Sequence, residues 1–203
     1  MDTREIWIEK GYEHFGLYGP DDLSIKKIAD ECGIARTSFN YYFSKKEEFC
    51  NELLEKHYDM VDQYIEAAVL HCKKYFDQHE LLLMFPSGFK FHKQLFNNRH
   101  HDKYDQIYIK CNEKCARKFT LRLFIDYYKL PLSLEEADPI HEALLDTWYS
   151  RLNVNDLTLE KMVSLTEEIM EGILVLLANK RNGVLKSPAS FVSNLNLTDL
   201  SKN

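Results

Sequence analysis

SIKKIADECGIARTSFNYYFSKK, residues 24–46, is the stretch of sequence that decides the fold of this chain. It reads as two short helices separated by a turn at Cys32-Gly33-Ile34 and followed by the start of another helix. Gly33 supplies the backbone freedom that a tight turn between two helices needs. The segment after the turn is polar on one side and aromatic on the other. We therefore predict a helix-turn-helix element whose second helix presents its polar side to a groove of DNA.

The composition favours an all-helical protein that contacts DNA locally. Hydrophobic residues make up 45% of the 203 residues, whereas Gly (7) and Pro (5) are too few for the many tight turns of a sandwich or barrel. The net charge of -6 excludes a uniformly basic surface. A basic patch nevertheless lies within residues 24–46. Its members are Lys26, Lys27, Arg36, Lys45 and Lys46.

Cysteine use and hydropathy indicate the compartment. The five cysteines are scattered and form no disulfide framework, and the first residues, MDTREIWIEK, contain no secretory hydrophobic segment. No apolar run approaches the roughly 20 residues that a membrane span needs. We therefore expect a cytoplasmic protein with reduced thiols and without a membrane segment.

Local signals place the first and the longest helices. An amphipathic helix is expected over residues 3–16, with Thr3 as its N-cap. Ser44 is followed three residues later by Glu47, which matches a capping box. We expect a long helix to begin there and to run to about residue 72.

The middle of the chain and its end give weaker signals. Residues 79–130 are helical in pattern but interrupted, because Pro86 and Gly88 break or kink a helix. Residues 102–129 support one or two helices. The last residues, 187–203, are rich in Ser and Asn and read as a flexible tail.

Two clean helices close the folded part of the chain. One covers residues 133–152 and opens with a second capping-box pattern, Ser133 and Glu136. The other covers residues 158–182 and stops at Gly183, a residue suited to the position after a helix.

Several features of residues 6–49 keep a fixed order and spacing. They are Phe15 with Gly19, Ser24-Ile25-x-x-Ile28-Ala29, Gly33-Ile34, Ser38-Phe39-x-Tyr41-Tyr42-Phe43 and Lys46-Glu47-Glu48-Phe49. This set resembles the N-terminal domain of the TetR family of bacterial transcriptional regulators. The resemblance covers about a quarter of the chain, and the remainder carries no motif that we recognise.

The resemblance implies an all-α protein of about nine helices. Residues 1–48 would be a three-helix helix-turn-helix domain, and residues 49–186 a helical domain for ligand binding and dimerisation. The helices at 133–152 and 158–182 would form a homodimer that binds double-stranded DNA at a palindromic operator. A small-molecule effector would move the long fourth helix and release the DNA, which is the behaviour of a repressor.

The resemblance also assigns DNA contacts position by position. The residues offered to bases are Arg36, Thr37, Ser38 and Asn40. The residues offered to phosphate or the sugar-phosphate edge are Tyr41, Tyr42, Ser24 and Lys46, the last two at helix N-termini.

The chain departs from the family pattern at three positions. Ala35 removes the usual cap of the recognition helix, and Gly11 replaces an alanine; each change should cost about 1 kcal/mol. Asn40 replaces a common tyrosine, and its amide can bond N6 and N7 of adenine together. Asn40 is therefore the most informative candidate for specificity.

The region between residues 75 and 128 is rich in Phe and Tyr. Most of these residues are explained by ordinary core packing, but the family resemblance favours a cavity for an apolar or aromatic effector. The candidate lining residues are Tyr64, Phe89, His92, Tyr108 and Trp148.

No local motif indicates catalysis, a cofactor or a metal. Cys111 and Cys115 share a helix face near His100 and His101, a weak metal or redox signal, and buried idle thiols explain them better. Two other functions stay open. The chain could be a helical ligand- or partner-binding protein with weakened or lost DNA binding, or an all-helical enzyme.

Overall fold

The structure is a computed structural model that describes residues 2–181. Every regular element among these residues is helical, which confirms the prediction of an all-α fold. The elements are α1 (Thr3–Tyr18), α2 (Ile25–Cys32), a 3₁₀ turn (Arg36–Ser38), α3 (Phe39–Tyr42), α4 (Lys46–His71), α5 (Asp77–Leu83), α6 (Pro86–Asn97), α7 (Asp102–Cys115), a π-helical turn (Ala116–Thr120), α8 (Leu121–Tyr128), α9 (Leu134–Arg151) and α10 (Leu159–Arg181).

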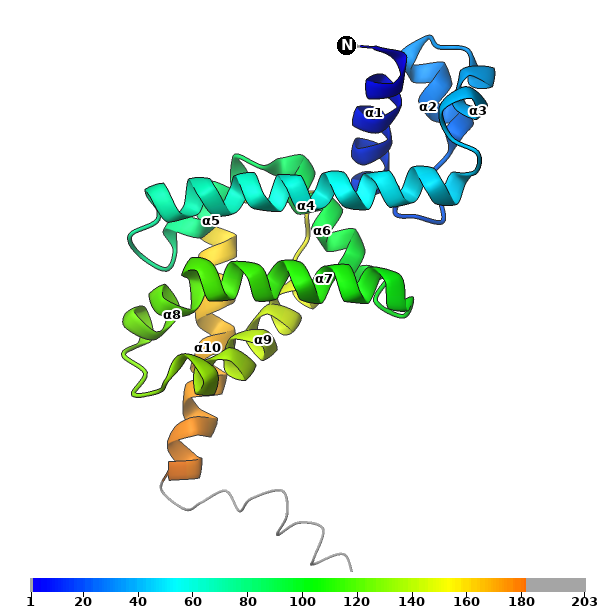
Figure 1. Ribbon diagram of the computed structural model, residues 1–203. Coiled ribbons are helices and arrows are strands. Elements are labelled where there is room, and N and C mark those ends of the chain that lie inside the picture. The colour runs from blue at the N-terminus through cyan, green and yellow to red at the C-terminus, as the bar shows by residue number, and fades with distance from the viewer. Residues whose placement is uncertain (1, 182–203) are drawn as a thin grey trace, which may run out of the picture.

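The helices are arranged along α4. Figure 1 shows α1, α2 and α3 at one end of this long helix, with α5, α6 and α7 next to its remaining length and α8 and α9 on the far side of α7. The C-terminal part of α10 projects past α8 and α9 (Figure 1). None of the helices in the described part of the chain is both long and apolar enough to cross a membrane.

Aromatic packing fixes α1 and α3 against the start of α4. The Trp7 and Phe39 ring centroids are 5.2 Å apart, and those of Phe39 and Phe49 are 5.3 Å apart. Phe43 lies 4.9 Å from Phe49 and closes the cluster. All four side chains are buried, so this cluster sets the orientation of α3 relative to α4.

The helix α1 also packs on α6. Phe91 of α6 stacks on both Tyr12 and Phe15 of α1, with ring centroids 4.4 Å and 4.1 Å apart. The three rings are buried in one continuous core. The N-terminal helices are therefore in direct contact with the rest of the protein, a contact that no local sequence pattern predicted.

Gly11 has a packing role that its sequence position did not reveal. A Cβ added there would lie 2.2 Å from Cζ of Phe49, a ring with no solvent exposure. Glycine is unfavourable in a helix, but here it makes room for the central ring of the aromatic cluster. The expected cost of Gly11 relative to alanine is therefore outweighed in this structure by the packing of Phe49.

We predict that Gly11→Ala lowers the free energy of unfolding by about 1–3 kcal/mol, because overpacking exceeds the gain of about 1 kcal/mol in helix propensity. Urea denaturation of both proteins would measure the change. The control is the double variant Gly11→Ala/Phe49→Leu. Its free energy of unfolding should be higher than that of the single variant Phe49→Leu, because the smaller side chain leaves room for the added Cβ. A more stable Gly11→Ala protein would contradict this packing argument.

Two of the predicted helix caps are wrong. Asp2, not Thr3, caps α1, because its carboxylate accepts a hydrogen bond from the Glu5 backbone N–H at 2.8 Å. At α4 the predicted capping box of Ser44 and Glu47 does not form. The backbone N–H and hydroxyl of Ser44 instead donate to Glu48, at 2.7 Å and 2.6 Å, since the helix begins one residue later than a Ser44 cap requires.

Other predicted boundaries are confirmed. The Ser24 hydroxyl caps α2, and Ser133 forms a capping box with Glu136 at the start of α9. Pro86 is the first residue of α6, so the interruption predicted there is a break between two helices. The predicted helix end at Gly183 and the tail 187–203 lie outside the described residues.

Candidate DNA-binding surface and ligand cavities

The turn after α2 sets the direction of the helix that follows. Gly33 has φ 63° and ψ 29°, the left-handed conformation, and the Ile34 backbone N–H donates to the Ala29 carbonyl at 3.1 Å. A Cβ at Gly33 would meet nothing within 4 Å, so the backbone conformation alone requires glycine. The predicted turn is therefore present at the predicted glycine.

Four of the predicted DNA-contacting side chains are exposed together after this turn. They are Arg36, Thr37, Asn40 and Tyr41, and we call them the reading face. Tyr41 is 83% exposed, whereas Phe39 and Phe43 on the opposite side are buried. Tyr42 is half-buried at the edge of this face. The arrangement leaves a polar, cationic surface on a short rigid helix.

Ser38 is placed differently from its predicted neighbours. Its hydroxyl donates to the Ala35 carbonyl at 2.7 Å and accepts the Trp7 indole N–H at 3.1 Å. The hydroxyl is thus already used in holding the turn against α1. A hydrogen bond to a base would require Ser38 to give up at least its bond to Ala35.

The two residues expected at helix N-termini retain donor capacity. Ser24 accepts the Lys27 backbone N–H at 3.3 Å, and its hydroxyl proton is available. The Lys46 ammonium donates to the Pro20 carbonyl at 2.9 Å, which places it between the start of α4 and the loop before α2. An ammonium has three protons, so Lys46 can contact this loop and an anion together.

The recognition segment has no side-chain cap. Ala35 occupies the N-cap position and no side chain bonds to the free N–H groups of the turn. We predict that Ala35→Ser stabilises the protein by about 0.5–1 kcal/mol, because a serine hydroxyl accepts one of these N–H groups. Thermal unfolding of this variant would measure the gain, with Ala35→Val as a control that adds volume and no acceptor. Equal stability of Ala35→Ser and Ala35→Val would contradict the prediction.

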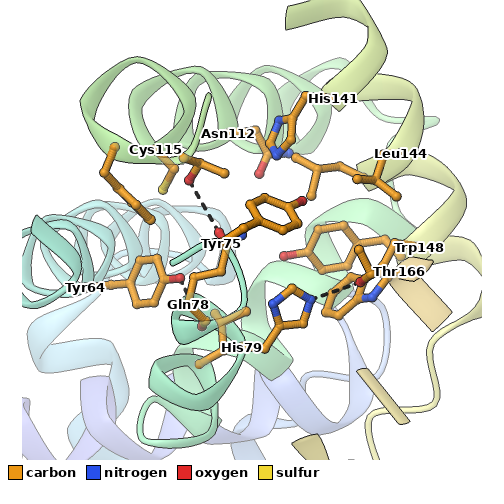
Figure 2. A pocket seen from close by; sticks show the side chains of 15 residues that line it. Tyr64, Tyr75, Gln78, His79, Asn112, Cys115, His141, Leu144, Trp148 and Thr166 are labelled. Carbon is orange, nitrogen blue, oxygen red and sulfur yellow. Dashed lines mark hydrogen bonds between the residues drawn. The ribbon is translucent and has the colours of Figure 1, made fainter. Parts of the chain in front are cut away.

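A first cavity of about 80 Å³ lies among α4, α5, α7, α9 and α10. Aromatic side chains form much of its wall, including Tyr64, Tyr75, Trp148 and Tyr149. Figure 2 shows this wall together with the hydrogen bond from His79 to Thr166, whose atoms are 3.0 Å apart. Among the described residues, the lining contains no Asp, Glu, Lys or Arg.

Two histidines leave polar atoms without a partner in the first cavity. Nδ1 and Nε2 of His141 and Nδ1 of His79 make no hydrogen bond in the described part of the chain. Both side chains are buried, and burial lowers the pKa of each to about 4. At neutral pH each ring is therefore uncharged, so His141 offers a donor and an acceptor, whereas His79, whose Nε2–H donates to Thr166, offers only the acceptor Nδ1. Buried polar atoms of this kind favour a ligand that carries hydrogen-bonding groups.

A second cavity of about 70 Å³ lies among α4, α6 and α7. Met60, Phe89, His92 and Cys111 contribute to its wall. The two cavities share part of their linings. The shared residues are Tyr64, Leu82, Asn112, Cys115 and Tyr149. A change at this shared wall therefore affects both spaces.

A buried chain of hydrogen bonds runs beside the second cavity. It joins Tyr12 Oη to Nδ1 of His57 (2.7 Å), Nε2 of His57 to Nδ1 of His92 (3.1 Å), and Nε2 of His92 to Oδ1 of Asn112 (3.1 Å). Because the amide oxygen can only accept, each earlier member donates to the next when both rings are neutral. These three hydrogen bonds thus connect α1 to α4, α6 and α7.

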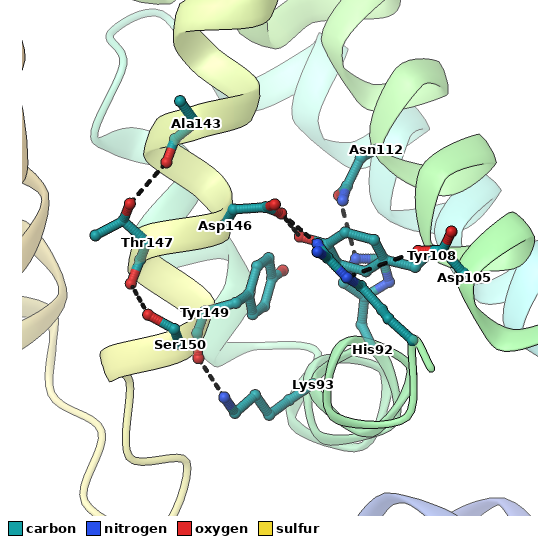
Figure 3. Close-up of polar contacts among 11 residues, drawn as sticks. His92, Lys93, Asp105, Tyr108, Asn112, Ala143, Asp146, Thr147, Tyr149 and Ser150 are labelled. Atoms are coloured by element: carbon teal, nitrogen blue, oxygen red, sulfur yellow. Dashed lines mark hydrogen bonds and ion pairs between the residues drawn. The ribbon is translucent and has the colours of Figure 1, made fainter. Parts of the chain in front are cut away.

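An ion pair and a hydrogen bond join α9 to the α6–α7 connection and to α7. Arg99 donates to Asp146 at 2.6 Å, and the Tyr108 hydroxyl donates to the same carboxylate oxygen at 3.2 Å. Figure 3 shows Asp146 beside Tyr108, with His92 and Asn112 close by. Burial and the adjacent Asp146 carboxylate both raise the pKa of Tyr108, so its hydroxyl stays protonated.

Comparisons with known proteins identify a family model and solved structures to which this chain is similar. Residues 3–53 match the family model described as bacterial regulatory proteins, tetR family. The fold is similar to a transcriptional regulator (TerR/AcrR family) from Aquifex aeolicus VF5, with a TM-score of 0.53, 20% identity, and coverage of 86% of this chain and 99% of that one. No curated protein sequence matches the chain.

The chain has the fold of a TetR-family transcriptional regulator. A second similar structure is a protein from Saccharomonospora viridis, described as a transcriptional regulator and solved with choline. Its TM-score is 0.63 at 16% identity, and the match covers 83% of this chain and 95% of that one. The family resemblance drawn from residues 6–49 is thereby confirmed.

The predicted pocket residues are distributed over three sites. Trp148 lines the first cavity, Phe89 and His92 line the second, and Tyr64 lines both. Tyr108 lines neither of these and borders a separate depression. His100 and His101 are exposed, and the metal-donor cluster of the described chain does not include them or Cys115.

Sequence reasoning missed several polar residues at the cavities. They are His57, His79, Asn112 and His141, which line the cavities, and Tyr12, which bonds to His57. A faint signal existed, because His57 stands midway between the inward-facing Leu53 and Val61 of α4. One sequence cannot show that such a histidine meets others from different helices.

Proposed function

We propose that this chain is a ligand-responsive transcriptional repressor that binds a palindromic operator as a homodimer and is released by a small molecule. The reading face carries the proposal, since Arg36, Thr37, Asn40 and Tyr41 are exposed on a helix that the aromatic cluster holds rigidly. Bidentate arginine and amide groups are the side chains that read bases in the major groove. Tyr42, Ser24 and Lys46 would supply phosphate contacts around this face.

We propose that residues 1–48 bind DNA and that residues 49–186 bind the ligand and form the dimer. The proposed boundary lies inside the continuous helix α4, and Phe49 packs on Trp7 across it, with ring centroids 6.4 Å apart. Movement of α4 would therefore be transmitted directly to the reading face.

The homodimer would form through α9 and α10. Apolar side chains are exposed toward the C-terminal end of α10, where Val175 is 54% and Leu176 58% exposed. Burying such a surface against a second copy would stabilise the pair. Light scattering should give twice the chain mass for the wild type and the chain mass for Val175→Glu/Leu176→Glu. Met84→Glu, at another exposed apolar position, is the control, and a monomeric wild type would contradict the dimer.

The effector would be an uncharged or weakly charged molecule with an aromatic or apolar body. Tyr64 and Trp148 would pack on this body, and the free nitrogens of His141 would bond to its polar groups. The link to DNA would run through the second cavity, where His57 of α4 is bonded to Tyr12 of α1. An effector that binds the DNA-incompetent shape about 100-fold better shifts the equilibrium by about 2.7 kcal/mol.

One experiment distinguishes this proposal from the alternative of a helical binding protein with lost DNA affinity. The uncapped turn at Ala35 and the net charge of -6 favour that alternative. Fluorescence anisotropy with the DNA upstream of the gene should show specific binding at low salt and a linear fall of log K with log salt concentration. Absence of binding at low salt would favour the alternative.

A further inference from the structure

Three metal-binding side chains from three helices converge beside the second cavity. His57 of α4, His92 of α6 and Cys111 of α7 each place a donor atom within 4.8 Å of the other two. All three side chains are buried, and all three line the cavity. Imidazole nitrogen and thiolate sulfur are the donors that zinc-type ions prefer, and no carboxylate that would suit Mg²⁺ or Ca²⁺ belongs to this described cluster.

The spacing of the donors is close to that of a tetrahedral site. Two nitrogens bound to one Zn²⁺ at about 2.1 Å lie about 3.4 Å apart. The facing nitrogens of His57 and His92 are 3.1 Å apart, within a few tenths of an ångström of that distance. All three donor atoms lie within 4.8 Å of one another, so the side chains would draw together around the ion. The cavity beside them leaves room for a water or a ligand atom at the fourth position.

The outer nitrogens already have the partners that orient metal ligands. Nε2 of His92 bonds to Oδ1 of Asn112, and Nδ1 of His57 bonds to the Tyr12 hydroxyl. Histidines that bind metals hold their second N–H in this way, which fixes the ring and increases the basicity of the inner nitrogen. Metal binding would move the His57 proton from Nε2 to Nδ1, where the Tyr12 oxygen accepts it, and would release the Cys111 thiol proton to solvent.

We propose that His57, His92 and Cys111 bind one divalent late first-row metal ion, with Zn²⁺ as its type, and that the fourth position faces the second cavity. The ion would tie α4, α6 and α7 together at one point. The site goes beyond the proposed function, and its test uses no DNA. Failure of metal binding leaves the DNA-binding proposal standing, and failure of DNA binding leaves the metal site standing.

Co²⁺ is the probe for the test. The full-length protein, stripped with a chelator and kept reduced, should take up one Co²⁺ per chain. Its spectrum should show the intense visible bands of tetrahedral cobalt and a thiolate-to-cobalt charge-transfer band, and Zn²⁺ should displace the cobalt. Zn²⁺ should also raise the unfolding temperature. No uptake, or an octahedral spectrum without the charge-transfer band, would overturn the proposal.

Cys111→Ser should lose the charge-transfer band and bind Co²⁺ at least 10-fold more weakly, and His92→Gln should also weaken binding. Cys72→Ser is the control, because Cys72 is another buried cysteine of the described chain and lies outside the donor cluster. A band that survives in Cys111→Ser or disappears in Cys72→Ser would overturn the assignment.

X-ray absorption of the zinc-loaded wild type is independent of any variant, and it should show two imidazoles and one sulfur. A shell without sulfur would reject the site.

Discussion

Lowering the pH from 7 to 5 is expected to remove about 4 kcal/mol of stability through His79 and His141 alone. Burial lowers the pKa of each side chain from 6.5 to about 4. Between these values the unfolded chain binds a proton at each histidine and the folded chain does not, so stability falls as the pH falls. Each group would cost about 3 kcal/mol once the pH is below 4. The free energy of unfolding of a small protein is only about 5–15 kcal/mol, so we expect acid unfolding near pH 4–5.

Urea denaturation at pH 7, 6 and 5 measures this loss, and His141→Leu is its sharpest control. The variant removes a buried ring whose two nitrogens have no partner in the described structure, so it should be roughly 1–3 kcal/mol more stable at pH 7. Unfolding of this variant should also take up one proton fewer per molecule between pH 7 and 5, so its stability should fall less steeply as the pH falls. Equal pH dependence of the two proteins would show that His141 is not the titrating group.

The same variant links stability to function. If the free nitrogens of His141 bind the effector, His141→Leu should keep DNA affinity and lose the response to effector. A polar group that destabilises the empty protein and serves its ligand is a common exchange of stability for activity. A stabilised variant with an intact response would place the effector elsewhere.

The parts of the fold that could be predicted from the sequence are local. Gly33 marks its turn because only a left-handed backbone fits there, and Ser133 with Glu136 marks a helix start because the two groups are three residues apart. Ser44 failed as a cap although it has the same signal. Glu48 competes for its donors, and a shift of one residue moves the helix start.

The parts that could not be predicted depend on contacts between distant residues. Gly11 reads as a weak point of a helix until Phe49 is seen against it. Ser38 reads as a base contact until the Trp7 indole is found on its hydroxyl. His57 and His92 lie on different helices and meet although they are 35 positions apart in the chain. In each case the pattern gives the face of the helix, and the partner that decides the role comes from elsewhere.

The largest effect on DNA is expected from Arg36→Ala. Loss of a bidentate base contact costs about 1–3 kcal/mol, and a dimer loses it at both half-sites. Operator affinity should therefore fall between about 30-fold and about 10⁴-fold, while non-specific DNA is affected far less. Since the Arg36 side chain is exposed and makes no hydrogen bond or ion pair in the described structure, the unfolding temperature should stay unchanged.

The variant Arg36→Lys separates base-specific hydrogen bonding from general electrostatic attraction to DNA. Lysine keeps the positive charge, so the salt dependence of binding should match that of the wild type. It lacks the planar fork that bonds two atoms of a guanine, so discrimination among operator variants should be lost at one position of each half-site. Asn40→Ala should change preference at a different position, whereas Lys46→Ala should weaken all sequences about equally. Unaltered preference in both Arg36→Lys and Asn40→Ala would remove the reading face from the recognition of bases.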